Sequence, residues 1–483
     1  MTPEEFARHG HAVVDRIARY MKEVESYPVR SRVKPGEILA GLEAVAPEHG
    51  ESMETILEDF ESVILPGMTH WSHPSFFAYF PANTSGPSIL GEFLTAGLGA
   101  QCMMWETSPA AAELEERVLE WLRDAMGLPG GWSGVIQDTA STATLCALLS
   151  AREKVTGFKA NREGVARAGA PLTVYASTEI HSSIPKGVKI AGYGEEALRL
   201  IPVDEGMAMN PAALEEAVEA DRKLGLRPAC VVACLGTTSA TAFDPLKAIS
   251  RITRKHDIWL HVDAAMAGSA ALLPEMQWMV DGVEDADSYV FNPHKWLFTN
   301  FDLSAHFVKD PAALVRTFEI HPEYLKTGVD HQVRNYRDWG IPLGRRFRAL
   351  KLWFVLRYYG LEGLRARLRE HLRLAGLFKE WVDEDAAFER MAQVPLNLIC
   401  FRYRPGGHAG GAEDTDHLDA LNRTLLDELN ASGTLYMTHT KIRGAFTLRM
   451  MIGQTYTEER HVRAAWKQIR ECAAGLSNAT ARL

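Results

Sequence analysis

The sequence predicts an α/β protein built on a mainly parallel β-sheet. Short apolar, β-branched runs recur between about residues 86 and 355, at 173–175, 230–234, 258–262 and 288–291, and amphipathic stretches separate them. This alternation is typical of strands linked by crossover helices, with both faces of the sheet buried. The 483 residues exceed what one core normally holds, so we expect about three structural units.

The chain begins with a predicted helix of about 20 residues. Thr2 is a capping residue, Pro3 suits the first helical position, and Glu5 completes a capping box. The Pro-interrupted segments between 33 and 47 cannot form a compact domain alone. We therefore interpret residues 1–85 as an arm that packs on a partner subunit.

Two further units are expected after this arm. The region 86–355 is the large α/β domain, and 356–483 is a smaller α+β domain that contains a Gly-rich surface loop at 405–411. In open α/β sheets, ligands bind at the carboxyl ends of the strands. The residues directly after the apolar runs are therefore the candidates for a site.

Composition and charge exclude several classes of protein. With 46% apolar and 24% charged residues, the chain is neither disordered nor fibrous. No apolar run reaches the ~18 residues of a membrane span and the start is acidic, so we expect a cytoplasmic protein without a membrane partner. The net charge of −10 argues against nucleic acid as a partner. The six cysteines contain no C-x-x-C pair, which argues against a disulfide framework or a metal site.

The first candidate segment, residues 134–144, is a strand that leads into a helix with small and hydroxyl residues at its start. Free backbone N–H groups and the helix dipole favour an anion at such a helix start. Thr139, Ala140 and Ser141 would let a phosphate approach closely. A plain Ser/Thr-capped helix is the simpler interpretation of this segment by itself.

Two other strand ends carry ionisable groups. Asp263 could hold a cationic ring nitrogen, and the small Ala265 would let a flat ring lie close; a loop cap or a structural ion pair is the alternative. Lys295 lies in apolar company, which lowers a lysine pKa and favours a Schiff base, although most lysines are merely solvated. Asn292 and His294 beside it offer donors for a phosphate.

A histidine and a tyrosine complete the candidates. His181 follows the apolar run 173–176 and could stack on a flat cofactor, although a lone histidine is more often structural. Tyr324 lies in the polar stretch 321–336, which could be a mobile lid with a proton donor or an ordinary surface loop. A phosphate cradle, an acid, a stacking histidine and a strand-end lysine are together the parts that hold pyridoxal phosphate.

With these parts, the sequence resembles the group II pyridoxal-phosphate-dependent decarboxylases, and among them the aromatic L-amino acid decarboxylases. The likeness runs almost end to end in ordered blocks, which is far more specific than one motif. These blocks are EFARHG (5–10), PGMTHW (66–71), HPSFFAYFP (73–81), WLHVDAAMAGSA (259–270), NPHKWLFTNFD (292–302) and IPLGRRFR (341–348).

The resemblance implies the type I aminotransferase fold, with a mainly parallel seven-stranded sheet, and a homodimer with active sites at the interface. It implies a carboxy-lyase that uses pyridoxal 5′-phosphate to convert an aromatic L-amino acid into the arylalkylamine and CO₂. The implied catalytic residues are Lys295, Tyr324, His181 and Asp263. The implied cofactor-binding residues are Thr139, Ala140, Ser141, His181, Thr238, Asp263, Ala265, Asn292, His294 and Lys295. The implied substrate-pocket residues are Trp71, Tyr79, Phe80, Ala82, Met103, Phe301 and Gly344.

Two departures from the family pattern concern the cofactor and the substrate. Asp138 and Thr139 replace the Gly-Ser of animal members, and an acid near a phosphate is unfavourable unless its side chain turns away to cap the helix. Met103 replaces a familiar aromatic residue, and Gln101 and Ala82 also differ. The residues thus leave open which aromatic amino acid is preferred.

Two other functions stay open. Relatives that make an aryl acetaldehyde, ammonia and hydrogen peroxide typically lack the loop tyrosine or the stacking histidine, whereas this chain has Tyr324 and His181. An inactive paralogue that binds the cofactor as a scaffold is the other alternative, and the intact Lys295 argues against it.

Overall fold

The computed structural model describes residues 1–320, 322–406 and 412–480, and the chain divides into two compact units. The first unit comprises Met1–Pro81, Gly376–Met391 and Ile399–Leu483, and the second comprises Ala82–Ala375 and Ala392–Leu398. Among the described residues, every helix is too short or too polar to cross a membrane.

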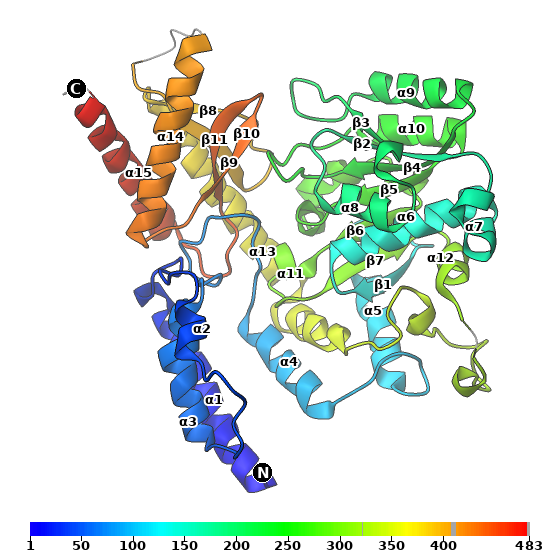
Figure 1. Cartoon of the computed structure of the whole chain (residues 1–483), viewed down its shortest axis with the longest axis horizontal. Coiled ribbons are helices and arrows are strands. Elements are labelled where there is room, and N and C mark those ends of the chain that lie inside the picture. The colour runs from blue at the N-terminus through cyan, green and yellow to red at the C-terminus, as the bar shows by residue number, and fades with distance from the viewer. Residues whose placement is uncertain (321, 407–411, 481–483) are drawn as a thin grey trace. The chain divides into compact units, whose positions relative to one another are not determined.

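A seven-stranded sheet forms the centre of the second unit, with the strand order β1-β7-β6-β5-β4-β2-β3 (Figure 1). Strands β3, β2, β4, β5 and β6 are parallel to one another, and β7 is antiparallel to its neighbours β6 and β1. Because β2, β5, β6 and β7 are buried along their whole length, helices must cover both faces. The mainly parallel α/β fold is thus confirmed. The strands are β1 (Ser133–Gln137), β2 (Leu172–Ser177), β3 (Leu198–Ile201), β4 (Arg227–Cys234), β5 (Trp259–Asp263), β6 (Ser288–Phe291) and β7 (Ser304–Val308).

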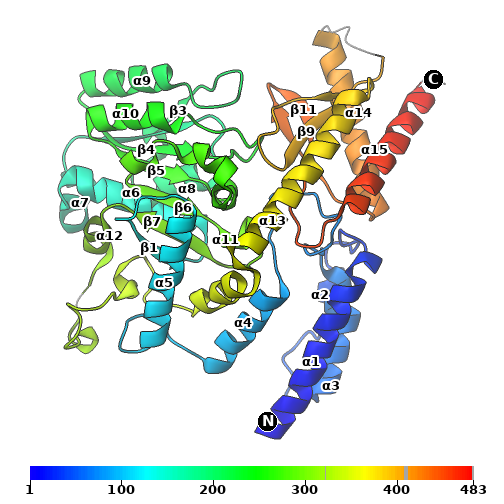
Figure 2. The ribbon, with the colours of Figure 1, turned by 180° about the vertical axis from the view of Figure 1, so that it is seen from behind.

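Helix α6 (Ala140–Thr156) contacts β1, β4, β5, β6 and β7, so it crosses much of the sheet. Helix α5 (Pro109–Ala125) lies beside β1 (Figure 2). Helix α13 (Arg348–Glu384) begins in the second unit, is interrupted at Gly360, whose φ is +63°, and ends in the first. The other helices of the second unit are α4 (Gly86–Leu98), α7 (Lys159–Glu163), α8 (Ser183–Ile190), α9 (Pro211–Lys223), α10 (Leu246–His256), α11 (Pro293–Trp296) and α12 (Pro311–Phe318).

The first unit combines N-terminal helices with a four-stranded sheet of order β10-β11-β9-β8. The predicted capping box is confirmed, because Thr2 Oγ1 accepts the Glu5 N–H and the Glu5 carboxylate accepts the Thr2 N–H. The Met451 N–H donates to Phe77 O at 3.0 Å, which ties residues 1–81 to this sheet. The elements are α1 (Pro3–Glu23), α2 (Glu37–Gly41), α3 (Met53–Asp59), β8 (Phe388–Arg390), β9 (Leu398–Tyr403), α14 (Ala412–Ser432), β10 (Thr438–Ile442), β11 (Ala445–Met451) and α15 (Glu459–Thr480).

Candidate active site

The predicted cofactor residues lie where strands of the large sheet end. Because β2, β4, β5 and β6 run in one direction, their carboxyl ends share one edge of the sheet. Ala265, just after β5, accordingly packs on Ala140 and Ala143 of α6 and on Val290 of β6. The predicted residues, in chain order, are Thr139 after β1, His181 after β2, Thr238 after β4, Asp263 at the end of β5, and Asn292, His294 and Lys295 after β6.

Lys295 is largely buried in surroundings that tune its amine. Burial lowers its pKa, while the nearby Asp263 and Cys234 act in the opposite direction. Its backbone N–H donates to Asn292 O at 2.9 Å, at the start of the short helix α11. A lowered pKa leaves more of the amine neutral, and the neutral amine is the form that attacks an aldehyde.

Asp263 is 5% exposed and lies close to both Lys295 and His181, since its charge affects the pKa of each. Its Oδ1 accepts the Ala265 N–H at 3.0 Å, so the loop cap considered as an alternative does form. Its Oδ2 makes no hydrogen bond within the described part of the chain. One carboxylate oxygen therefore holds the loop, and the other is available to a ligand.

The His181 ring is oriented by its own loop. Its Nδ1 accepts the Ser183 N–H at 3.1 Å and lies 2.8 Å from Ser183 Oγ, which assigns the hydrogen of the neutral ring to Nε2. Burial first, and then the positive charge of Lys295, lower the pKa of His181. The lowered pKa favours the neutral ring, which can stack on a flat heteroaromatic ring.

At the start of α6, the helix cap is Thr139, whose Oγ1 accepts the Thr142 N–H at 3.5 Å. Asp138 does not cap the helix itself. Its Oδ1 accepts the Thr139 N–H at 2.6 Å, which turns the carboxylate back onto the turn. Ala140 is buried and small, and Ser141 is exposed. The start of α6 thus offers backbone N–H groups and a positive dipole end to an anion.

Asn292 and His294 add polar groups that suit a phosphate. Asn292 Oδ1 is buried and has no hydrogen-bond partner among the described residues, and rotation of the amide would present a donor there. His294 Nδ1 accepts the Leu303 N–H at 2.9 Å, so Nε2 carries the hydrogen. Burial lowers the pKa of His294 to about 3, which keeps the ring neutral. An orphaned buried amide, a neutral donor and a helix start fit a phosphate-bearing ring such as pyridoxal phosphate.

The expected substrate residues fall in both compact units. In the first unit, the rings of Trp71 and Tyr79 stack at 5.7 Å, and Arg449 lies 5.7 Å from the Phe80 ring. In the second unit, the Phe301 ring lies 4.8 Å from the ring of His294, a predicted cofactor residue. The distance to His294 joins Phe301 to the predicted cofactor residues of the second unit.

Three smaller pocket residues also belong to the second unit. Ala82 precedes Asn83, whose N–H donates to His294 O at 3.0 Å. A Cβ added to Gly344 would lie 3.2 Å from Gln101 Nε2. Gly344 is thus next to the segment that carries Met103, whose carbonyl accepts the Arg337 N–H at 2.8 Å.

Tyr324 is not brought to the lysine. It lies in the 3₁₀ turn Glu323–Leu325, is 77% exposed, and makes no hydrogen bond or ring contact with the described residues. Its neighbour Leu325 is buried, and the Leu325 carbonyl accepts from Arg337 Nη1 at 2.9 Å. Residue 321, at the start of the predicted lid, lies outside the described residues.

Two buried charged residues near the site were missed as individual candidates. Glu115 of α5 and Arg345, inside the quoted block 341–348, form an ion pair at 2.6 Å. Both bind the backbone of Ile136 at the end of β1. The paired arginines of the block were a usable signal, whereas Glu115 has no distinguishing local pattern.

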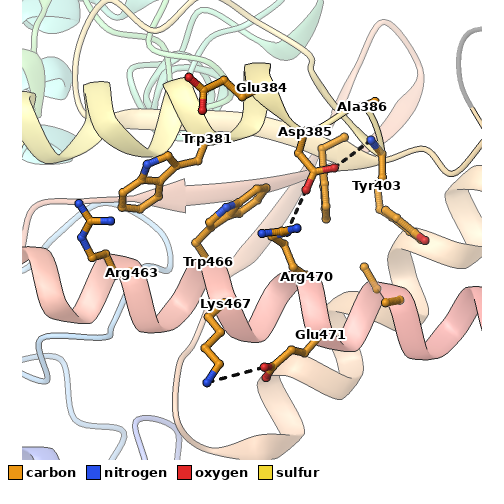
Figure 3. Close-up of a pocket in the computed structure, with 14 residues that line it drawn as sticks. Trp381, Glu384, Asp385, Ala386, Tyr403, Arg463, Trp466, Lys467, Arg470 and Glu471 are labelled. Carbon is orange, nitrogen blue, oxygen red and sulfur yellow. Dashed lines mark hydrogen bonds and ion pairs between the residues drawn. The ribbon is translucent and has the colours of Figure 1, made fainter.

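The first unit contains a separate cleft of about 950 Å³ between the end of α13 and α15 (Figure 3). Trp381 and Trp466 line it, and the Arg470–Asp385 ion pair at 2.9 Å lies along one side. A second ion pair of the lining joins Lys467 to Glu471 at 3.8 Å, and no predicted site residue lines the cleft. We therefore do not assign it to the chemistry.

Known proteins match almost the whole length of the chain. The family model of the pyridoxal-dependent decarboxylase conserved domain matches residues 35–404. Tyrosine decarboxylase 1 of Narcissus pseudonarcissus is 43% identical over 99% of this chain and 94% of its own. Phenylacetaldehyde synthase of Arabidopsis thaliana is 44% identical over 99% of this chain and 97% of its own. The crystal structure of Oryza sativa TDC with PLP and tryptamine superposes with a TM-score of 0.94 at 37% identity, over 99% of each chain.

Proposed function

Because this chain belongs to the pyridoxal-dependent decarboxylase family, we propose that it converts an aromatic L-amino acid into the arylalkylamine and CO₂. The observation that carries the proposal is the meeting of Lys295, Asp263 and His181 at one edge of the sheet. Bound pyridoxal 5′-phosphate supplies an electron sink for the bonding pair that remains when CO₂ leaves. The residues of the chain must hold this group and deliver a proton to the product carbon.

Each strand end has a task in this proposal. The Lys295 amine would hold the cofactor covalently, and its lowered pKa favours that attachment. Asp263 Oδ2 would keep a proton on the ring nitrogen, and the neutral His181 ring would lie against the cofactor ring. Thr238 and Ala265 would line the same space. The phosphate would be bound by Thr139, Ala140, Ser141, Asn292 and His294.

We assign the protonation of the substrate Cα to the Tyr324 hydroxyl. Its 77% exposure means that the turn Glu323–Leu325 must close over the site before it can act. Closure would also exclude water and oxygen from the reacting carbon. In the second unit, Ala82, Met103, Phe301 and Gly344 would contact the aromatic side chain of the substrate, and the same role of Trp71, Tyr79 and Phe80 stays a prediction.

A second candidate function is decarboxylation with oxidative deamination to an aryl acetaldehyde. The 44% identity to phenylacetaldehyde synthase favours it as much as the tyrosine decarboxylase favours the amine. Tyr324 and His181 are both present here, and the relatives that make aldehydes typically lack one of them. The protonation step therefore decides between the two products.

The deciding experiment measures four products in one assay. The holoenzyme is given phenylalanine, tyrosine, dopa, tryptophan or 5-hydroxytryptophan, and CO₂, amine, aldehyde and hydrogen peroxide are quantified. We expect amine equal to CO₂ and no peroxide, and for Tyr324→Phe a shift towards aldehyde and peroxide. Tyr358→Phe, at another exposed tyrosine, is the matched control. If the chain binds the cofactor but releases no CO₂, both enzymatic functions are excluded and an inactive cofactor-binding scaffold remains.

We also infer a cytoplasmic homodimer, with residues 1–85 as a dimerisation arm, 86–355 as the cofactor domain and 356–483 as the C-terminal domain. Helix α1 buries none of its residues, and Phe6, Leu39 and Val45 are 66%, 77% and 76% exposed. Apolar side chains of this kind are expected to be covered by a second copy. All six cysteines are free thiols, which suits a reducing compartment. Sedimentation of the wild-type chain as a monomer would contradict the dimer.

A further inference from the structure

The outer edge of β1 pairs with no other strand in the described part of the chain. β1 ends the sheet order and is bonded to β7 alone. Every second residue of such an edge strand presents its N–H and C=O away from the sheet, and buried groups of this kind need a partner from elsewhere. Ile136, opposite Ala305 in the register, is 2% exposed and is such a residue.

Two side chains make the hydrogen bonds to the Ile136 backbone that a neighbouring strand would otherwise make. Glu115 Oε1 accepts the Ile136 N–H at 2.8 Å, and Arg345 Nη2 donates to the Ile136 carbonyl at 3.0 Å. Arg345 Nη2 also donates to Glu115 Oε1 at 2.6 Å, and the two residues are 9% and 4% exposed. The buried ion pair therefore closes a hydrogen-bonded ring with one residue of the edge strand, where low polarity strengthens each bond.

This ring is close along the chain to the predicted phosphate site. Only two residues separate Ile136 from Thr139, the cap of α6. The first of them, Gln137, is held as well, because its Nε2 donates to Trp339 O at 3.0 Å. A cavity of about 130 Å³ adjoins the ring, and its lining includes Gln137, Asp138, Gly344 and Arg345. A shift of Ile136 would therefore be passed directly to the start of α6.

Arg345 also connects this strand to the segment that carries Tyr324. Its Nη1 donates to Tyr336 O at 3.1 Å, and its guanidinium lies 4.9 Å from the centroid of the Tyr336 ring. One residue later, Arg337 Nη1 donates to Leu325 O at 2.9 Å. A continuous set of contacts thus runs from β1 through Arg345 to the residue beside Tyr324.

We propose that Glu115 and Arg345 are positioning residues of the cofactor site, which hold the carboxyl end of β1 and the Tyr324 segment in one frame and thereby set the affinity for pyridoxal phosphate. This inference rests on the proposed function. A guanidinium is needed because its planar fork reaches Glu115, the Ile136 carbonyl and the Tyr336 carbonyl at once. A lysine ammonium is a single point on a flexible stem and cannot bridge all three.

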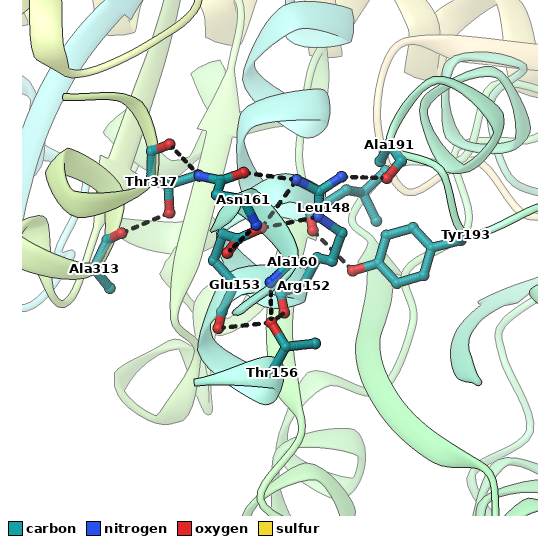
Figure 4. Close-up of polar contacts among 10 residues, drawn as sticks. All are labelled: Leu148, Arg152, Glu153, Thr156, Ala160, Asn161, Ala191, Tyr193, Ala313 and Thr317. Atoms are coloured by element: carbon teal, nitrogen blue, oxygen red, sulfur yellow. Dashed lines mark hydrogen bonds and ion pairs between the residues drawn. The ribbon is translucent and has the colours of Figure 1, made fainter. Parts of the chain in front are cut away.

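The test compares Arg345→Lys with Arg152→Lys. Arg152 uses its fork in the same way near the other end of α6, where it binds Glu153, the Ala191 carbonyl and Asn161 Oδ1 (Figure 4). Each full-length variant is stripped of cofactor, and pyridoxal phosphate is titrated back while its absorbance is followed. Trypsin cleavage after the exposed Lys326 is timed in the same samples.

We expect Arg345→Lys to bind pyridoxal phosphate at least about tenfold more weakly than wild type, and to be cleaved after Lys326 several times faster. Arg152→Lys should change neither quantity. If Arg345→Lys does not fold, Glu115→Gln and Glu153→Gln repeat the comparison. Wild-type affinity and cleavage in the Arg345 variant, or an equal loss in both arginine variants, overturn the proposal. A wild-type chain that binds no pyridoxal phosphate overturns the proposed function instead, and the cleavage rates still decide whether the pair anchors the segment.

Discussion

The two ends of helix α6 use the same residue types for different purposes. Each end lies near a largely buried arginine–glutamate pair, Arg345–Glu115 at the N-terminal end and Arg152–Glu153 at the C-terminal end. Both arginines reach beyond their glutamate to backbone carbonyls. The N-terminal end lies at the carboxyl edge of the sheet, where ligands of α/β folds bind, and the C-terminal end lies away from it.

The difference lies in what remains unsatisfied. At the C-terminal end, Glu153 accepts from Arg152 and from the Asn161 N–H, and Asn161 Nδ2 donates to Thr317 O (Figure 4). At the N-terminal end, the buried Asn292 Oδ1 has no partner among the described residues. A network that satisfies itself stabilises the fold, whereas one that leaves a polar position open can take a ligand.

The largest expected effect comes from a comparison of two lysines, Lys295 at the predicted cofactor site and Lys154 near the C-terminal end of α6. Lys295→Ala should abolish covalent attachment of pyridoxal phosphate and lower decarboxylation by about 10³-fold or more. Lys154→Ala removes a half-exposed lysine near the C-terminal end of α6, which contacts Asp287 at 3.0 Å. Borohydride reduction followed by mass spectrometry measures the attached cofactor. Retention of the added mass in Lys295→Ala would show that another amine holds it.

A smaller effect, on the free energy of unfolding, is expected at the C-terminal end of α6. Glu153→Ala leaves the buried Arg152 charge and the Asn161 N–H without their partner, and should lower the free energy of unfolding by about 3 kcal/mol. Urea unfolding measures this loss, and the folded variant should keep wild-type affinity for pyridoxal phosphate. Glu163→Ala, in an exposed pair with Arg162, is the control and should change little. Weakened cofactor binding in Glu153→Ala would contradict the view that the C-terminal end of α6 serves stability alone.

Much of the candidate site near the N-terminal end of α6 could be predicted from the sequence, because its residues come at or just after the ends of strands. A buried parallel strand is a continuous apolar run, so the predicted runs 258–262 and 288–291 correspond to β5 and β6 almost residue for residue. Asp263 and Lys295 could be singled out because charged side chains at the ends of such runs are unusual. The antiparallel direction of β7 could not be predicted in this way, because no sequence pattern marks it.

The supporting contacts could not be predicted in the same way. Glu115 lies on a helix with Glu113 and Glu116, and a helix with several acids resembles a solvated face. Its burial is decided by Arg345, 230 positions later in the chain. The exposure of Tyr324 likewise depends on how a long segment packs and not on its local pattern. Contacts between distant segments are tertiary facts, which periodicity does not encode.

The smallest expected effect compares the caps of α6. Thr139→Ala removes the side-chain cap at the N-terminus, and Gly157→Ala places a Cβ on a residue whose φ is +64° at the C-terminus. Each should cost about 1 kcal/mol of stability. No atom lies within 4 Å of the added Cβ at Gly157, so its cost is conformational alone. Only Thr139→Ala should also weaken pyridoxal phosphate binding, because only that cap faces the phosphate site. Equal affinities in the two variants, measured by the same absorbance titration, would mean that the start of α6 is a plain capped helix.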